Sequence, residues 1–299
     1  MVTRGCRSPF VPCPPSQHVS SHNPKRHPMS ETTSQPKAPA LSHAPGTFCW
    51  WEIITSDLER SRSFYSELFG WSYTENPIGE GRVYVSFQQE GHDVAATYEL
   101  TPEMKAQGGR PHWFSYIATE DARATTEKVR EHGGTVMMEP FDVFDLGSMA
   151  ILQDPTGAVF AIWQAKAHPG AGLVGEVNTV CWNELATRDA ATATAFYRDV
   201  FGYEIGTMET PSGPYTLLQQ GEAMRGGILQ MTDEWPEGIP THWMPYVNVA
   251  DCDDTARRAK TLGATLLVPP TDIPPVGRFS VIKDPGGAVF SIIRLNEPA

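Results

Sequence analysis

Two copies of one pattern organise this chain. The first copy reads Phe48-Cys-Trp-Trp-Glu-Ile-Ile-Thr-Ser-Asp57 and continues as Ser63-Phe-Tyr-Ser-Glu-Leu-Phe-Gly-Trp71. The second reads Val180-Cys-Trp-Asn-Glu-Leu-Ala-Thr-Arg-Asp189 and continues as Ala195-Phe-Tyr-Arg-Asp-Val-Phe-Gly-Tyr203. Cys, Trp, Glu, Asp, Phe, Tyr, Phe and Gly recur at a constant offset of 132 residues (184 − 52). Such a repeat predicts two copies of one domain.

Each copy is typical of a strand followed by a helix. Phe48–Ile54 is apolar and aromatic, as in a buried strand. Ser56-Asp57 supplies N-cap candidates, and Gly70 is placed to end the helix. Strands are expected at 71–74, 83–88 and 94–100, which completes a strand–helix–strand–strand–strand unit. After a Pro/Gly-rich linker the same order recurs within 112–163, and the second half of the chain repeats it all.

Length and composition indicate a water-soluble protein of two domains. The chain has 299 residues, of which 40% are hydrophobic and 19% charged, and no apolar run reaches the ~18 residues of a membrane span. Its net charge of −12 argues against nucleic-acid binding. We therefore expect no nucleic-acid partner, no membrane association, a cytoplasmic location and a monomer or homodimer. The five cysteines form no CxxC pair, and Cys49 and Cys181 are expected to be buried, reduced thiols.

The expected domain boundaries follow from composition and from the repeat. The first 28 residues contain no acidic side chain, six prolines and no apolar core of a signal peptide. Residues 1–45 are therefore expected to be a disordered tail. The first domain is expected at 46–165, a linker at 166–177 and the second domain at 178–296.

The motifs resemble one known superfamily. Asp57-Leu-Glu-Arg-Ser, the Leu-Phe-Gly-Trp71 sequence and the closing Asp154-Pro-Thr-Gly-Ala-Val-Phe are similar to the vicinal oxygen chelate (VOC) superfamily, which includes glyoxalases, bleomycin-resistance proteins and dioxygenases. The tandem form resembles glyoxylase-like proteins of mycobacteria. The resemblance implies an α+β fold with two tandem VOC domains. Each would be an open cup made of two paired βαβββ units.

The resemblance also implies where a divalent metal would be held, because the superfamily uses His, Gln or Glu from the first and last strand of each unit. Counted onto this sequence, the positions carry few such side chains: Trp50, Ala96, Phe114 or His112, and Ala161, then Trp182, Gly226, Met244 or His242, and Ser291. One His with a displaced Glu in each domain is too few for a catalytic ion. The sequence therefore predicts no metal and no other cofactor.

Two acidic residues are the candidates for chemistry in the cups. Glu52 and Glu184 lie two residues after Trp50 and Trp182, so each Glu shares a strand face with a Trp. Burial beside Trp would raise the pKa of the carboxyl group and suit it to proton transfer or to binding a hydroxyl group. The alternative is a structural carboxylate that bonds backbone groups or Arg.

The strands that begin the second units carry further candidates. His112 and His242 are acid–base or ligand-binding candidates, with a turn-capping role as the alternative. The ligand-binding candidates are aromatic or flexible apolar side chains, which suit a flat molecule: Trp50, Phe114, Tyr116, Trp182, Met244 and Tyr246. Arg278 fits either an anion site in the second cup or an ordinary surface position.

Two classes of function fit these residues. The first is a protein that binds a small, aromatic metabolite in a metal-free cup, with a sequestering or accessory role. The second is an enzyme of the glyoxalase or lyase type, acting through Glu52, His112, Glu184 and His242, or through a metal bound in an unexpected way. An enzyme should change its ligand, whereas a binding protein should leave it unchanged.

Overall fold

The computed structural model describes residues 43–210 and 213–296. Almost all of the tail expected at 1–45 therefore lies outside the described residues. His43, the first described residue, hydrogen-bonds the carbonyl of Ala171 through Nε2 at 2.8 Å. No helix in the described part of the chain is both long and apolar enough to span a membrane.

The first domain follows the expected order of strands and helices. Its elements are β1 (Phe48–Thr55), α1 (Leu58–Phe69), β2 (Ser72–Pro77), β3 (Val83–Gln89), β4 (His92–Glu99), α2 (Pro102–Ala106), β5 (His112–Ala118), α3 (Ala122–Glu131), β6 (Thr135–Val143), β7 (Gly147–Gln153) and β8 (Val159–Ala165). The short helix α2 was not expected within the Pro/Gly-rich segment. It forms because Thr101 caps it and Pro102 begins it, where a missing N–H costs nothing.

The second domain repeats this order without a counterpart of α2 in the described chain. Its elements are β9 (Val180–Thr187), α4 (Ala190–Phe201), β10 (Glu204–Thr210), β11 (Gly213–Gln220), β12 (Ala223–Gln230), β13 (His242–Asn248), α5 (Cys252–Thr261), β14 (Thr265–Ile273), β15 (Gly277–Lys283) and β16 (Val289–Leu295).

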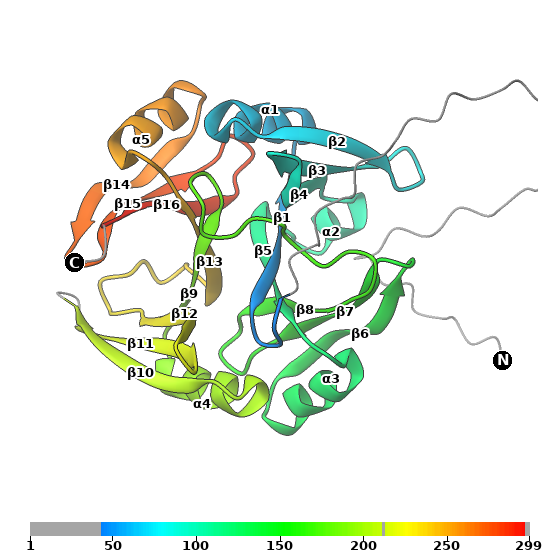
Figure 1. Ribbon diagram of the computed structural model, residues 1–299, viewed down its shortest axis with the longest axis vertical. Coiled ribbons are helices and arrows are strands. Elements are labelled where there is room, and N and C mark those ends of the chain that lie inside the picture. Colours follow the sequence, from blue (N-terminus) through cyan, green and yellow to red (C-terminus); the bar gives the residue numbers. More distant parts are fainter. Residues whose placement is uncertain (1–42, 211–212, 297–299) are drawn as a thin grey trace, which may run out of the picture.

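Each domain is one curled sheet of eight strands, as the α+β prediction requires. The strand orders are β2-β3-β4-β1-β5-β8-β7-β6 and β10-β11-β12-β9-β13-β16-β15-β14. The two units of each domain meet where β1 pairs with β5 and β9 with β13, both antiparallel. The sheets lie back to back, so that the two cups open in opposite directions (Figure 1).

The helix that follows the first strand has the caps that the sequence predicts. Asp57 accepts a hydrogen bond from the Arg60 N–H at 3.0 Å and caps α1. Gly70 ends the helix in the left-handed conformation, with φ of 75°, which a residue without Cβ adopts freely. Asp189 and Gly202 play the same two roles for α4.

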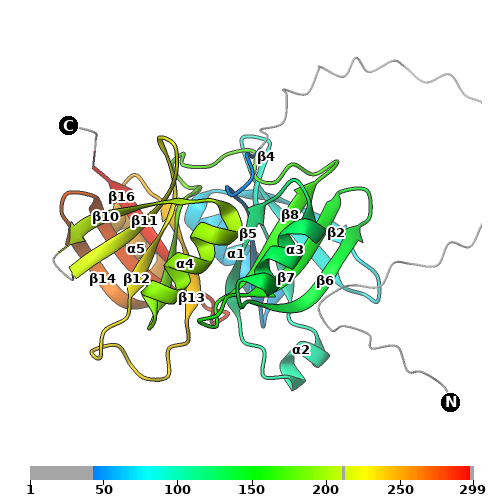
Figure 2. The ribbon, with the colours of Figure 1, turned by 90° about the horizontal axis from the view of Figure 1, so that it is seen from below.

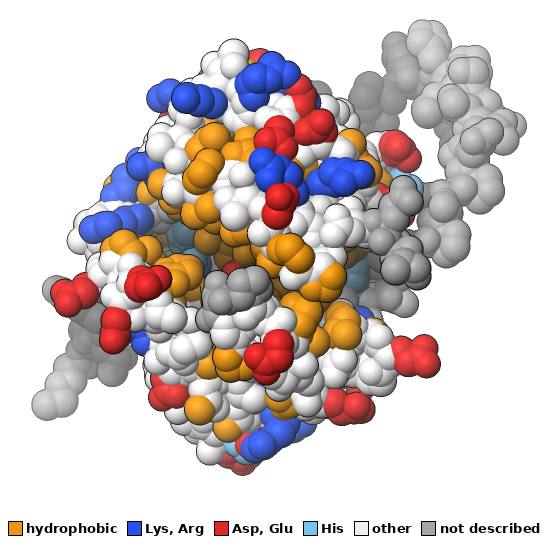
Figure 3. Space-filling model, turned by 90° about the vertical axis from the view of Figure 1, so that its left-hand side faces the viewer, with side chains coloured by type: hydrophobic (Ala, Val, Ile, Leu, Met, Phe, Trp, Pro, Cys, Tyr) orange, Lys and Arg blue, Asp and Glu red, His pale blue; other side chains and the backbone are white. Residues whose placement is uncertain are grey.

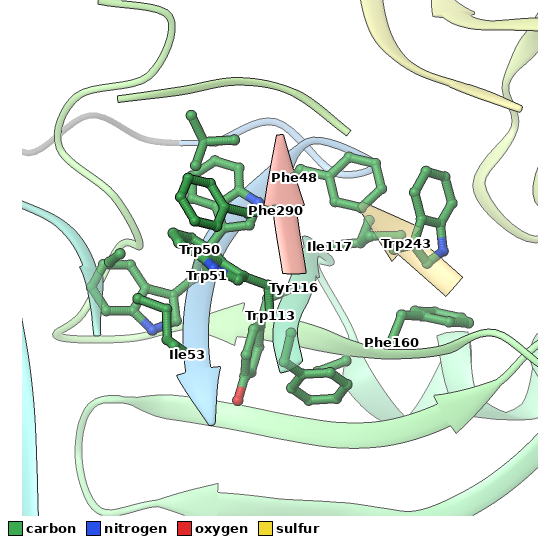
Figure 4. Close-up of a cluster of buried hydrophobic side chains, with 14 of the residues drawn as sticks. Phe48, Trp50, Trp51, Ile53, Trp113, Tyr116, Ile117, Phe160, Trp243 and Phe290 are labelled. Atoms are coloured by element: carbon green, nitrogen blue, oxygen red, sulfur yellow. The ribbon is translucent and has the colours of Figure 1, made fainter. Parts of the chain in front are cut away.

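The core runs continuously through both domains. Helix α1 lies beside α5 of the other domain, and α4 lies beside α3 (Figures 1 and 2). The ring of Phe48 lies 4.8 Å from that of Trp243, and Phe290 packs at 5.7 Å from Trp113. Figure 4 shows Trp243 and Phe290 of the second domain among side chains of β1 and β5. The two domains therefore share apolar burial, which is the main favourable term in folding.

Buried hydrogen bonds also cross between the domains. Trp113 Nε1 donates to the Tyr65 hydroxyl at 2.9 Å, and that hydroxyl donates to Asp284 Oδ2 at 2.8 Å. The same chain recurs with the domains exchanged, at 2.8 and 3.0 Å, through Trp243, Tyr197 and Asp154. Each first helix is thereby anchored to the last hairpin turn of the other domain.

Candidate functional site

Alternation along the central strands gives each sheet two different faces. In β1, Trp51 points toward the other domain, where its Nε1 donates to Asn183 Oδ1 at 2.8 Å. Trp50 and Glu52 therefore point to the opposite, concave face. In the register of the sheet, Trp50 pairs with Tyr116 and Glu52 with Phe114. The structure thus brings these four predicted site residues together, and we call their face the first cup.

Glu52 is the centre of a hydrogen-bond network in the first cup. Its Oε2 accepts a bond from the Tyr116 hydroxyl at 2.6 Å, and its Oε1 accepts one from the Tyr84 hydroxyl at 2.8 Å. Trp50 Nε1 donates to the Tyr84 oxygen at 3.1 Å. Glu52 is only 7% exposed. Both carboxylate oxygens are thus satisfied by phenol groups, as buried charges require.

Burial shifts the pKa values of this network upward. Desolvation raises the pKa of Glu52, although the hydrogen bonds from Tyr116, Tyr84 and Trp50 oppose the shift. Burial, together with the charge of Glu52, raises the pKa of Tyr84 and of Tyr116 well above that of free tyrosine. The phenols therefore keep their protons, and the carboxyl group is the group in this network that can exchange one near neutral pH.

The second cup repeats the arrangement with a more open carboxylate. We define it by Trp182 and Glu184 of β9 with Met244 and Tyr246 of β13, which pair in the same register. The Tyr246 hydroxyl donates to Glu184 Oε1 at 2.9 Å. Trp182 Nε1 donates to the Tyr215 hydroxyl at 2.9 Å. Burial raises the pKa of Glu184, and the hydroxyls of Tyr246 and Tyr215 oppose the shift.

Sequence reasoning missed Tyr84 and Tyr215. They occupy equivalent positions in β3 and β11, at an offset of 131 residues (215 − 84). The prediction used offsets of 132 and 130 only, because it placed one gap of two residues in the second half. The structure instead has two separate gaps of one residue, before β11 and between β12 and β13. Aligning strand by strand would have revealed the pair.

The two candidate histidines lie on the cup faces but bond to the backbone. His112 Nδ1 bonds the Arg110 carbonyl at 2.7 Å, and His242 Nδ1 bonds the Pro240 carbonyl at 2.8 Å. A carbonyl only accepts, so each Nδ1 carries the proton. In the neutral ring Nε2 is then an acceptor. No hydrogen bond joins either His to Glu52 or Glu184 among the described residues.

The residues at the metal positions do not fit a metal ion. Ala96 and Ala161 lie beside Glu52 and Tyr116 in the sheet and carry no ligand atom, and both oxygens of Glu52 are already bonded to phenols. No group of three or more His, Cys, Asp or Glu side chains suited to a metal occurs within residues 43–210 and 213–296. A divalent ion needs at least three such ligands to be held tightly.

One expected metal position in the second domain is wrong. Gly226 was expected in the cup, but a Cβ there would lie 2.8 Å from the Asn183 carbonyl oxygen, on the face toward the other domain. Gly227 pairs with Glu184, as Ala96 pairs with Glu52, and is the true counterpart. A Cβ on Gly227 would lie 2.1 Å from the Tyr215 hydroxyl oxygen, so this glycine makes room for the tyrosine.

Arg278 does not face the second cup. Phe279, its neighbour in β15, packs toward Tyr246, so Arg278 points to the opposite face. There its guanidinium group forms ion pairs with Asp253 and Asp272. The interpretation of Arg278 as an anion site of the cup is therefore wrong. It is a surface ion-pair residue that attaches β15 to the start of α5.

With this geometry established, comparison with known proteins identifies the family. The model of the Glyoxalase/Bleomycin resistance protein/Dioxygenase superfamily matches residues 47–162 and again 177–292. The chain belongs to this superfamily. The two matches agree with the two curled sheets and with the resemblance of the sequence motifs.

Two relatives match over most of the chain. CFP32 of Mycobacterium bovis, provisionally named a glyoxylase, is 42% identical over 251 residues, which cover 83% of this chain and 95% of that protein. The anthracycline biosynthesis protein DauV of Streptomyces sp. strain C5 is 35% identical over 266 residues, 85% of this chain and 95% of that protein.

Solved structures share the fold at low identity. The Mn(II)-bound glyoxalase of Novosphingobium aromaticivorans superimposes with a TM-score of 0.60 at 18% identity, covering 85% of this chain and 83% of that one. A variant of homoprotocatechuate 2,3-dioxygenase from B. fuscum gives 0.59 at 15% identity, covering 89% and 75%. At this identity the likeness concerns the fold alone.

Proposed function

We propose that this protein binds a small, planar aromatic metabolite in a metal-free cup, in a sequestering or accessory role. The observation that carries the proposal is the repeated network of Trp, Tyr and Glu on a concave sheet face. Trp182, Tyr215, Glu184 and Tyr246 provide flat apolar walls with a few oriented polar groups, which is the usual composition of a small-molecule site.

The chemistry of the walls indicates the class of ligand. An indole ring offers stacking worth about 0.5–1.5 kcal/mol beyond burial. A carboxylate with phenol neighbours accepts hydrogen bonds from ligand hydroxyl groups. A hydroxylated quinone has both features. The relative named for anthracycline biosynthesis supports this class, because anthracyclines are polycyclic hydroxyquinones.

The donor set supports binding without a metal. Each cup supplies one carboxylate, and Ala96 and Gly227 stand beside it where a ligand side chain would be needed. We expect elemental analysis of protein grown with added Zn, Ni, Fe and Mn to find well under one ion per chain. A tightly held ion that is lost in Glu52→Ala or Glu184→Ala would contradict the proposal.

One observation favours an enzyme of the lyase or isomerase type as the second candidate. Glu184 has a raised pKa, and the neutral ring of His242 presents an acceptor Nε2 on the same face. Such a pair can move a proton on a bound molecule. Mass spectrometry of the recovered ligand separates the two candidates, since an enzyme would convert it and a binding protein would not.

Binding itself is tested with 1,4-dihydroxyanthraquinone as the probe. We expect quenching of tryptophan fluorescence and a saturable heat of binding in calorimetry. Glu184→Gln should weaken binding, because the carboxylate is the acceptor for a ligand hydroxyl. The exposed Glu120→Gln serves as the matched control. Absence of binding across a panel of planar hydroxyquinones would refute the proposed function.

A further inference from the structure

The two cups differ in how far their walls are exposed. In the first cup Trp50, Glu52, Phe114 and Tyr116 are between 4% and 7% exposed. In the second cup Trp182, Glu184 and Met244 are half-buried, and only Tyr246 is buried. Equivalent residues on equivalent strands therefore meet different surroundings. Figure 3 shows hydrophobic side chains gathered around a hollow on the side of the second domain.

The segment between the domains accounts for the burial of the first cup. After β8 the chain turns back, and the imidazole of His168 packs edge-on against Trp50 at 4.7 Å. Trp163, the last cup-facing residue of β8, donates from Nε1 to the His168 carbonyl at 2.9 Å. Ala171 N–H then donates to the Cys49 carbonyl at 2.7 Å. We call residues 166–172 the plug.

The plug is held at both ends and on several strands. The N–H groups of Lys166 and His168 donate to the Leu146 carbonyl at 3.0 Å, and Gly172 N–H donates to the Asp93 carbonyl at 2.7 Å. Gly170 adopts φ of 106° with its Cα against the Cys49 carbonyl, where a Cβ would come within 2.4 Å. Such close packing of backbone on β1 is characteristic of a fixed segment, not of a mobile lid.

The second cup has no plug within the described chain. The described residues end at Asn296, one residue after β16, and its N–H bonds the Val276 carbonyl at 2.9 Å. Ser291, which replaces Ala161 of the first cup, adds a buried hydroxyl beside Tyr246. Gly227 replaces Ala96 and lets Tyr215 lie close to the strand. The second cup is thus more open and more polar than the first.

We propose that the second cup alone takes the aromatic ligand, and that the first cup is sealed by the plug and serves as a structural core. This inference rests on the proposed function and specifies its site. Glu52 with its two phenol partners then stabilises the folded first domain, whereas Glu184 meets the ligand.

Calorimetric stoichiometry tests the inference. With 1,4-dihydroxyanthraquinone we expect one molecule per chain, and we expect Trp182→Ala to abolish binding. Met244→Trp, which fills the half-exposed mouth of the cup without removing a wall, should abolish it as well and guards against misfolding of the first variant. Two molecules per chain, or one molecule retained by both variants, would overturn the inference while leaving the proposed function intact.

Hydroxyl-radical footprinting with peptide mass spectrometry tests the plug without any ligand. In the wild type we expect Trp182 to be oxidised several-fold faster than Trp50. His168→Gly should raise the oxidation of Trp50, whereas Glu176→Gly, an exposed position of the same linker, should not. Equal oxidation of Trp50 and Trp182 would overturn the inference. No dye binding by any form would overturn both the inference and the proposed function.

Discussion

At the scale of the residue, the same Glu, Trp and Tyr side chains occur in two environments. Glu52 is enclosed and bonded by two phenols, whereas Glu184 accepts one hydrogen bond of normal geometry, from Tyr246, among the described residues. Burial raises the pKa of both carboxyl groups. A raised carboxyl pKa has a cost in stability that can be measured.

We expect Glu52→Gln to flatten part of the pH dependence of stability. Above the pKa of about 4.5 in the unfolded chain, and up to the raised pKa in the folded protein, the folded state holds more protons. Stability of the wild type therefore falls as pH rises through this window. Urea titrations from pH 4 to 8 should show the free energy of unfolding of Glu52→Gln gaining on that of the wild type, while exposed Glu120→Gln follows the wild type. Parallel curves for all three would contradict the prediction.

A second prediction at this scale concerns Gly227. An added methyl group would lie 2.1 Å from the Tyr215 oxygen, so Gly227→Ala should displace that ring and break its hydrogen bond with Trp182. We expect affinity for 1,4-dihydroxyanthraquinone to fall about tenfold, which corresponds to about 1.4 kcal/mol. Ala96→Gly, the reciprocal change in the first cup, should leave affinity unchanged. Equal affinity of Gly227→Ala and the wild type would show that Tyr215 takes no part in binding.

At the scale of the element, helices α1 and α4 connect the domains. Each carries a tyrosine that accepts from a buried Trp and donates to a buried Asp of the other domain. Burial raises the pKa of Asp284 and of Asp154, and the hydrogen bond from the tyrosine opposes the shift in each case. The tyrosine hydroxyl is therefore a positioning group for both neighbours.

Tyr65→Phe should destabilise the protein by about 1–3 kcal/mol, because a buried carboxylate and a buried indole N–H each lose a partner. Tyr197→Phe should cost a similar amount, since its network has the same geometry. The half-exposed Tyr73→Phe, 42% exposed, is the control. Chemical denaturation gives the three values. A change below about 0.5 kcal/mol in both core variants would mean that these bonds contribute nothing net.

At the scale of the whole molecule, the pairing of the domains is specific to two unlike halves. Trp51 and Asn183 occupy the same position of the repeat, and they contact each other across the interface. Ser115 also donates to Asn183 Oδ1, at 3.3 Å. Two first domains would place Trp51 against Trp51, and the indole N–H would lose its acceptor. The two halves are therefore complementary and not interchangeable.

Separated halves, residues 43–176 and 177–296, should not be stable monomers, because each would expose core side chains such as Trp51 and Phe290 to water. We expect aggregation of each half alone and a one-to-one complex when both are expressed together. Size-exclusion chromatography with light scattering distinguishes these states. A half that remains monomeric and unfolds cooperatively would refute the shared core.

The sequence by itself determined the repeat, the α+β class, the helix caps and the identity of Trp50, Glu52, Tyr116 and their counterparts as one face. These follow from periodicity and local chemistry, which act over a few residues. Tertiary structure alone decided the roles of Tyr84, Tyr215, Gly227 and Arg278, because strand register and single-residue gaps set which side chains meet. It also decided that the linker packs on Trp50, a contact between residues far apart along the chain that no local pattern records. Equivalent sequences thus became one buried cup and one open cup.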